Sequence, residues 1–279
     1  MGRVVKAIAV AASAVAPSAV ALSAGAALSG GAALSTGAAL AAPNPIVDAA
    51  RRTAKMRTMS LSLQSVTVVA GAGEVKIGGT VEQVGTASAR LALVVRANGE
   101  RIALDGVMLR EQGRYVMYAR SPAFAANLPP GKEWMRFDLD AAARNQGIDF
   151  SGLVASQGTL GPLEHGIEKT TKLETGEVAG VRATRYRVVL DVARAAAKVP
   201  AFGKQITALE GATGIRLRQL KYDVWIDGDG LLRRVRFAIP LASEAARGSS
   251  TTTMTFTDFN QPVEVTAPPA DLVASPPPA

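Results

Sequence analysis

Cysteine is absent from the 279-residue sequence, and histidine occurs once, at His165. The lack of cysteine excludes a disulfide framework, a thiolate metal site, a cysteine nucleophile and an acylated N-terminal cysteine. A single histidine cannot form a histidine-rich zinc site. The sequence also contains no Gly-x-Ser-x-Gly elbow, no Walker-type phosphate loop and no dinucleotide fingerprint. We therefore predict a protein that is not an enzyme and that holds no metal or cofactor.

Aromatic residues make up only 5% of the chain, and charged residues 19%. Proteins that bind single-stranded nucleic acid usually stack bases on aromatic side chains, so this composition argues against a nucleic-acid partner. The net charge of +8, from 31 basic and 23 acidic residues, indicates non-specific attraction to anionic surfaces. We predict no nucleic acid and a transient contact with a membrane surface.

The first 41 residues have the features of a signal peptide. Arg3 and Lys6 precede an uncharged run rich in Ala, Val, Leu and Ser, and Ala39-Leu40-Ala41 fits the small-x-small rule for cleavage. We predict that residues 1–41 are removed and that the protein is exported to the periplasm or cell envelope, or secreted. The uncharged run is long enough to cross a bilayer. An uncleaved N-terminal membrane anchor is therefore the alternative.

Residues 215–259 predict three successive antiparallel strands. Apolar residues alternate with polar ones along the first strand, at Leu220, Tyr222, Val224 and Ile226. The following Asp227-Gly228-Asp229-Gly230 predicts a hairpin turn into a second strand. A calcium loop starting at Asp227 is the alternative, but its twelfth position, which needs an acidic ligand, is Ala238. A third strand is predicted over 251–259.

Similar patterns predict strands between 59 and 120, over 132–139 and between 172 and 190, with short helices near 45–57, 150–157 and 191–212. Ten or eleven antiparallel strands form a sheet so wide that it must curl, and its inner face then needs covering. The predicted fold class is α+β, a wide curved antiparallel β-sheet with short helices covering the concave face. We assign residues 42–273 to this domain and 274–279 to a disordered tail.

Five segments follow one another in an order that carries a resemblance. They are the helix Ile46–Arg57, the segment Gly131–Leu139, Gly176–Val181 with Thr184–Tyr186, Asp223–Asp227 with Gly230–Val235, and Phe256–Asn260 with Val263 and Pro268-Pro269. This series, spanning 45–273, resembles the LolA-like superfamily of lipoprotein carriers, and within it the LppX/LprG-type lipid carriers. The lipobox cysteine of that group is missing here. The chain is therefore expected to be soluble after export, or held by its N-terminus, rather than acyl-anchored.

The resemblance implies a half-barrel with an apolar cavity for the acyl chains of a lipid or acylated ligand. We also predict that the protein is a monomer. Each methylene that leaves water gains about 0.8 kcal/mol, so such a cavity would hold long acyl chains firmly. Candidate lining residues are apolar members of one strand face: Leu104, Met117, Tyr186, Val188, Leu190, Tyr222, Val224, Phe237, Met254 and Phe256. Ordinary core between sheet and helix is the alternative for each. Which face points inward cannot be deduced from sequence, because a β-bulge reverses it.

Three other functions remain open beside a lipid carrier. An envelope sensor of the same fold would bind a membrane partner, and a structural module would have a fully packed concave face. A hydrolase would have to use His165, with Glu164 and Glu168 beside it, although a surface histidine is the simpler interpretation. A basic band could also cross adjacent strands and bind anionic lipid headgroups, or be only a solvated face: Arg216, Arg218, Lys221, Arg233, Arg234 and Arg236.

Overall fold

The computed structural model describes residues 44–70, 73–85, 88–139, 165–213, 216–242 and 247–274. The predicted signal peptide and the predicted helix at 150–157 lie outside these residues. So do residues 275–279 of the predicted disordered tail. The domain boundaries proposed from the sequence therefore stay predictions.

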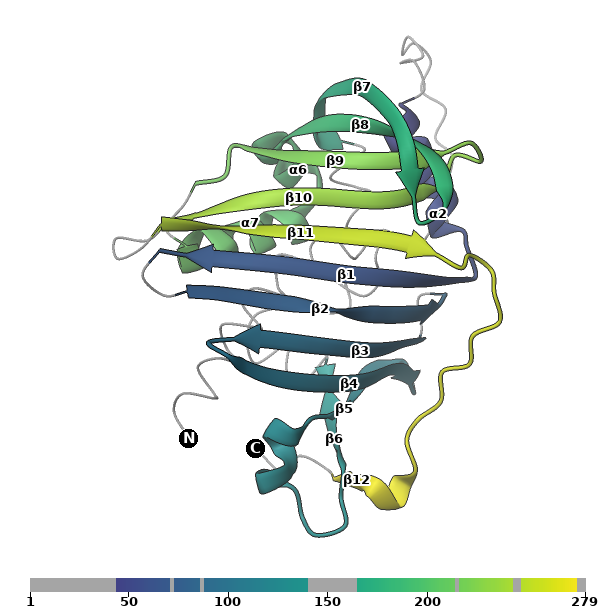
Figure 1. Cartoon of the computed structure of the whole chain (residues 1–279), viewed down its shortest axis with the longest axis vertical. Helices are drawn as coiled ribbons and strands as arrows, with labels where there is room; N and C mark the ends of the chain where they lie inside the picture. Colours follow the sequence, from purple (N-terminus) through teal and green to yellow (C-terminus); the bar gives the residue numbers. More distant parts are fainter. Residues whose placement is uncertain are drawn as a thin grey trace.

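One continuous sheet of twelve strands makes up most of the described structure (Figure 1). The strands are β1 (Thr58–Val69), β2 (Gly73–Val84), β3 (Ser88–Ala97), β4 (Glu100–Glu111), β5 (Arg114–Arg120), β6 (Trp134–Asp138), β7 (Ile167–Val178), β8 (Val181–Asp191), β9 (Gln219–Asp227), β10 (Leu232–Ala242), β11 (Arg247–Thr257) and β12 (Val273–Ala274). Their order across the sheet is β12-β6-β5-β4-β3-β2-β1-β11-β10-β9-β8-β7. The predicted wide, curved α+β sheet is confirmed.

Tight turns between neighbouring strands give the sheet its mainly antiparallel order. Two-residue turns with both residues at positive φ join β3 to β4 at Asn98-Gly99 and β4 to β5 at Gln112-Gly113. Such turns match the twist of a hairpin. Strands β1 and β11 pair with each other at the centre, so the two halves of the chain meet there. Only the β12–β6 pair is parallel among the described strands, which makes the sheet mixed rather than purely antiparallel.

Among the described residues, three α-helices lie behind the sheet as it is drawn in Figure 1: α2 (Pro45–Ala54), α6 (Val192–Lys198) and α7 (Pro200–Thr213). Asn44 caps α2 by accepting a hydrogen bond from the Ile46 amide, and Asp191 caps α6 by accepting one from the Arg194 amide. Pro200 begins α7, where a missing N–H costs nothing. Most of the buried side chains of the three helices belong to the main hydrophobic core of the sheet.

Helix α2 is fixed to the β9–β10 hairpin by one buried polar contact. The Thr53 hydroxyl accepts a hydrogen bond of 2.9 Å from the amide of Leu232. Arg52 lies over Gly230 in the hairpin turn. Burial of Ile46, Ala49 and Ala50 completes the contact, as the amphipathic pattern of this helix predicts.

The C-terminal residues 258–274 are held against the rest of the sheet by hydrogen bonds. They run along the side of the sheet from β11 to β12 and end in the short 3-10 helix η2 (Ala270–Leu272) and in β12 (Figure 1). The backbone oxygen of Leu272 accepts a hydrogen bond from the Glu133 amide, and that of Glu264 accepts one from Arg90. Ala274 is buried, one residue beyond the predicted end of the domain. This strap therefore covers the edge strand β6, and a small apolar cluster packs beneath it: Val107, Val116, Tyr118, Trp134, Val265 and Val273. A second 3-10 helix, η1 (Pro122–Asn127), precedes β6.

Candidate functional site

The registers of the strands place the candidate lining residues on one face of the sheet. Side chains of directly paired residues point to the same side. One row of paired residues crosses eight strands in the order Leu104, Leu93, Gly79, Leu63, Met254, Val235, Val224 and Tyr186. Four of the ten candidates lie in this row: Leu104, Met254, Val224 and Tyr186.

The other six candidates lie in parallel rows on the same face. Val188 is paired with Tyr222 and Tyr222 with Phe237, while Leu190 is paired with Leu220. Phe256 is paired with Leu61, and Met117 with Met108. All ten predicted residues therefore share the face that packs against α2, α6 and α7, which we call the inner face; the opposite side is the outer face.

The helices cover part of the inner face completely. Six of the candidates are buried there, with 7% of their surface or less exposed: Val188, Leu190, Val224, Phe237, Met254 and Phe256. They pack with Phe202 and Ile206 of α7 and with Val192 and Ala195 of α6 in the main core. In the described structure these six serve as ordinary core, which is the alternative that the sequence left open.

The inner face stays apolar beyond the helices, toward β6. There Leu104, Met108, Met117 and Phe137 are only partly buried. Met108 is paired with Met117, and Met117 with Phe137, so these side chains adjoin one another across three strands. We call these four residues the apolar strip. Sequence reasoning selected Leu104 and Met117 but missed Met108 and Phe137, although both follow the alternation of their strands.

A glycine shapes the middle of the apolar strip. Gly106 lies between Leu104 and Met108 on β4, and a Cβ atom there would be 2.7 Å from Cε of Met117 and 3.0 Å from Cδ1 of Leu91. Without a side chain at this position, Met117 extends over the backbone of β4. Methionine is flexible and polarisable, so a strip with two methionines can adapt to an apolar surface of varying shape.

Tyr222 brings a phenol to the inner face. Its ring packs on that of Phe237, with 5.6 Å between the centroids. Although the residue is only partly buried, desolvation of the hydroxyl raises the pKa of Tyr222 above its ordinary value. The phenol therefore stays neutral over the whole physiological range, and the inner face carries no negative charge at this point.

Paired hydroxyl groups replace apolar side chains where β1 and β11 continue past Leu63 and Met254. The Ser65 and Thr252 hydroxyls lie 3.1 Å apart, and those of Thr67 and Ser250 lie 3.0 Å apart. All four residues are buried. Because each hydroxyl has a partner, the buried polar atoms cost little. No local sequence pattern indicates these pairs, since they join strands about 180 residues apart.

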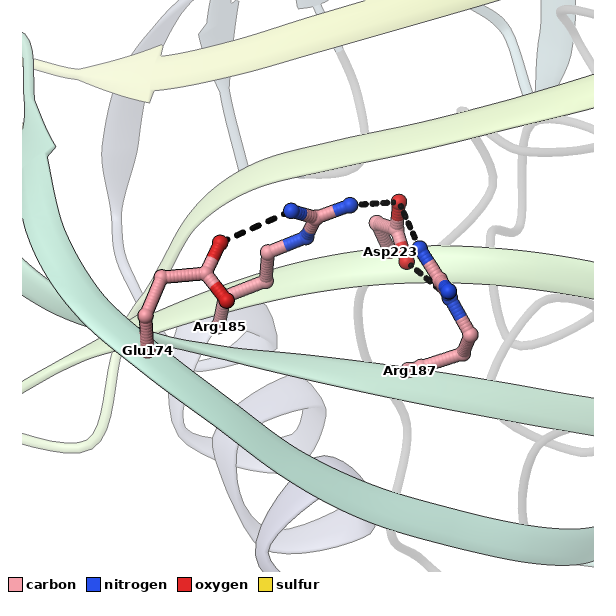
Figure 2. Close-up of polar contacts among 4 residues, drawn as sticks. All are labelled: Glu174, Arg185, Arg187 and Asp223. Carbon is pink, nitrogen blue, oxygen red and sulfur yellow. Dashed lines mark hydrogen bonds and ion pairs between the residues drawn. The ribbon is translucent and has the colours of Figure 1, made fainter.

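The outer face carries ion pairs on β7 to β9 (Figure 2). Asp223 accepts hydrogen bonds from Arg185 at 2.5 Å and from Arg187 at 2.9 Å, and Arg185 also contacts Glu174 at 2.8 Å. Partial burial alone would raise the pKa of Asp223, but the hydrogen bonds from the two guanidinium groups outweigh it and hold this pKa below its usual value. The positive charge of both arginines is thus largely compensated.

The predicted basic band is only partly present on this face. Arg236 is paired with Asp223 and Arg234 with Trp225, and Lys221 lies on the same side of β9. Arg233 does not belong to the band. A register shift between Leu232 and Arg234 turns its side chain toward Asp227, to which it donates at 2.6 Å, and over the ring of Phe259. Arg216 and Arg218 precede β9 and lie outside the sheet.

Asp227 and His165, the candidates for calcium binding and for catalysis, occupy ordinary structural positions. The predicted hairpin turn is present, with Gly230 at positive φ, and the Asp227 carboxylate accepts hydrogen bonds from the amides of Asp229 and Leu231 as well as from Arg233. These donors occupy the oxygens that a calcium ion would need. His165 is exposed. Within the described ranges no three His, Cys, Asp or Glu side chains gather as a metal site, and no helix is long and apolar enough to span a bilayer.

No protein-family model matches the chain, and no curated protein matches it in sequence. Solved structures with a similar fold include LppX, a lipoprotein of Mycobacterium tuberculosis, with 14% identity and a TM-score of 0.45 over 80% of this chain and 96% of that one. LprF from Mycobacterium bovis has 13% identity and a TM-score of 0.45, over 81% and 98% of the two chains. A LolA superfamily protein of Nitrosomonas europaea has 9% identity and a TM-score of 0.29, over 75% and 89%.

These neighbours include LppX and a LolA superfamily protein, the groups that the sequence itself resembles. At identities of 14% or less and TM-scores below 0.5, they assign no function to this chain. A proposal for its function therefore has to rest on the inner face and its residues.

Proposed function

We propose that this protein is a non-enzymatic lipid-binding protein that holds acyl chains against its inner face. The observation that carries the proposal is the apolar strip, where Leu104, Met108, Met117 and Phe137 extend the core beyond α2, α6 and α7 and stay partly exposed. An apolar surface of this kind favours an apolar occupant, at about 0.8 kcal/mol for each methylene removed from water.

The proposal includes a carrier role in the cell envelope, by a monomer. Export is supported by the basic start, the uncharged run and Ala39-Leu40-Ala41 in the first 41 residues. A carrier must also release its cargo. Flexible methionines suit this, because they bind apolar chains without a fixed shape and hold none by a polar contact.

Two charge insertions on adjacent residues of β4 test the proposal. Leu104 points to the inner face, and its neighbour Ala103 points to the outer face. We expect Leu104→Arg to weaken uptake of a fluorescent fatty acid by roughly tenfold or more, because a guanidinium group replaces an apolar contact. Ala103→Arg, which brings the same group to the same strand, should bind like the parent protein.

The fold of each variant is checked by its unfolding midpoint, and Leu104→Asn serves as the milder change if Leu104→Arg does not fold. Parent protein that takes up neither a fatty acid nor a phospholipid would disprove the proposal. Equal uptake by the Leu104 variants and the parent would move the binding site away from the apolar strip.

A further inference from the structure

Three basic side chains lie directly opposite one another on the outer face of β2, β3 and β4. Lys76 is paired with Arg96, and Arg96 with Arg101. Their neighbour Ile77 is buried on the inner side, so the three cations point outward, and all three are exposed. We call them the cationic row. Adjacent strands are about 4.8 Å apart, so the row concentrates three positive charges within about 10 Å.

Few acidic side chains of the protein neutralise the positive charges of the cationic row. Lys76 contacts Glu74 at 2.7 Å, with both side chains about half exposed, but Arg96 and Arg101 make no ion pair with any residue in the described ranges. Like charges directly opposite each other destabilise a sheet. The arginines of Figure 2 differ, because Asp223 and Glu174 balance them.

An exposed apolar side chain lies beside the cationic row. Val68 is 45% exposed and is the one large apolar residue found exposed among the described residues. It lies on the outer face of β1, where it is paired with Glu74 and lies two residues from Val66, the partner of Lys76. Trp225, an aromatic residue elsewhere on this face, is flanked by the guanidinium groups of Arg185 and Arg234 and offers no comparable apolar surface.

We propose that this end of the outer face docks on a bilayer containing anionic phospholipids. The cationic row binds the phosphate groups, and Val68 enters the interface between headgroups and acyl chains. Charge complementarity selects this occupant: basic residues near an anionic leaflet each strengthen binding, while an adjacent apolar side chain gains only from a surface that has an apolar interior. The docking surface lies on β1 to β4 rather than on the basic band of β9 and β10.

The inference goes beyond the proposed lipid-binding function and does not depend on it. Docking uses the outer face, whereas acyl chains are proposed to lie on the inner face. A protein that fails one of the two can still pass the other, provided that vesicle binding and fatty-acid uptake are measured separately on the same variants.

The test is co-sedimentation of the full-length mature protein with vesicles of phosphatidylcholine alone or mixed with phosphatidylglycerol. We expect binding to the mixed vesicles only, and weaker binding at high salt. Arg96→Glu should weaken it by roughly tenfold. The same substitution should keep or raise the unfolding midpoint, because it replaces two like-charge contacts by two opposite-charge contacts. Its fatty-acid uptake should stay that of the parent.

Two further variants separate the docking surface from net charge. Lys204→Glu makes a like change of charge at an exposed position of α7 and should bind mixed vesicles as the parent does. Val68→Thr keeps the shape and charge but should weaken binding about fourfold, since it withdraws roughly one methyl group from the interface.

Three results would overturn the inference. They are an absence of binding to mixed vesicles, unchanged binding by Arg96→Glu, and an equal loss in Arg96→Glu and Lys204→Glu. Retention on immobilised heparin that Arg96→Glu abolishes, without any vesicle binding, would assign the cationic row to an acidic polymer and equally refute a membrane partner.

Discussion

Single side chains on the inner face differ in how completely the protein covers them, and this difference locates the proposed site. Val188 and Met254 have no measurable exposure under the helices, whereas Leu104 and Met117 remain partly open. Buried residues of the first kind stabilise the fold, and replacing them would create cavities. Residues of the second kind can be changed with less damage, which makes them suitable for testing ligand binding.

The raised pKa of Tyr222 predicts a specific dependence of stability on pH. Burial raises this pKa in the folded state, so the folded protein keeps the phenolic proton after the unfolded chain has lost it. The contribution to stability is complete below the unfolded pKa of about 10 and is lost as the pH rises above it, by up to about 1.4 kcal/mol per pH unit. We expect Tyr222→Phe to show a shallower alkaline decline than the parent, measured by urea unfolding. Parallel declines in the two proteins would show that Tyr222 is not the group responsible.

Arg233 illustrates what the sequence could not reveal about single residues. Its closeness in sequence suggests that it belongs with Arg234 and Arg236, but the register shifts at this point and its side chain pairs with Asp227. A bulge depends on the pairing of two strands and leaves no clear mark in either one. The cationic row was missed for a similar reason, since its three members become neighbours only when β2, β3 and β4 are aligned.

Among the elements, α2 is joined to the β9–β10 hairpin by one buried hydrogen bond in addition to its buried apolar side chains. Thr53 is 1% exposed and supplies the acceptor for the Leu232 amide. Because no water can replace the hydroxyl at this depth, its removal leaves an unsatisfied N–H. The helix covers one end of the inner face, so its loss would also uncover core residues.

Thr53→Val tests this contact, since it keeps the shape of the side chain and removes the acceptor. We expect a loss of about 1–3 kcal/mol in the free energy of unfolding. Amide hydrogen exchange at Leu232 should become faster. Thr53→Ser, which retains the acceptor, should keep the slow exchange even if it loses some stability with the missing methyl group. Unchanged exchange in Thr53→Val would mean that the hydrogen bond does not hold the helix.

Local sequence patterns predict most strands and helices. The strand β12 is an exception, because a distant contact creates it. Alternation and turns such as Asn98-Gly99 predict β3, β4 and β5, and the caps and amphipathic spacing predict α2. The strand β12 is only two residues long and exists because it pairs with β6, far away in the sequence. A pattern read within a short window cannot find an element that a distant contact creates.

For the whole molecule, the shared orientation of the ten predicted lining residues follows from the hairpins. Directly paired residues in a hairpin point to the same side, so alternation in one strand fixes the face in the next. Which face the helices cover became clear only from the assembled sheet. The apolar strip needed that sheet as well, because β4, β5 and β6 bring its members together.

The central claim is that the inner face holds acyl chains, and native mass spectrometry of the mature protein purified from its own host tests it most directly. We expect a stoichiometric mass increment above the polypeptide that organic extraction recovers as a lipid. A protein with the bare polypeptide mass, which also fails to take up added fatty acid or phospholipid, would contradict it and favour a sensor or structural role.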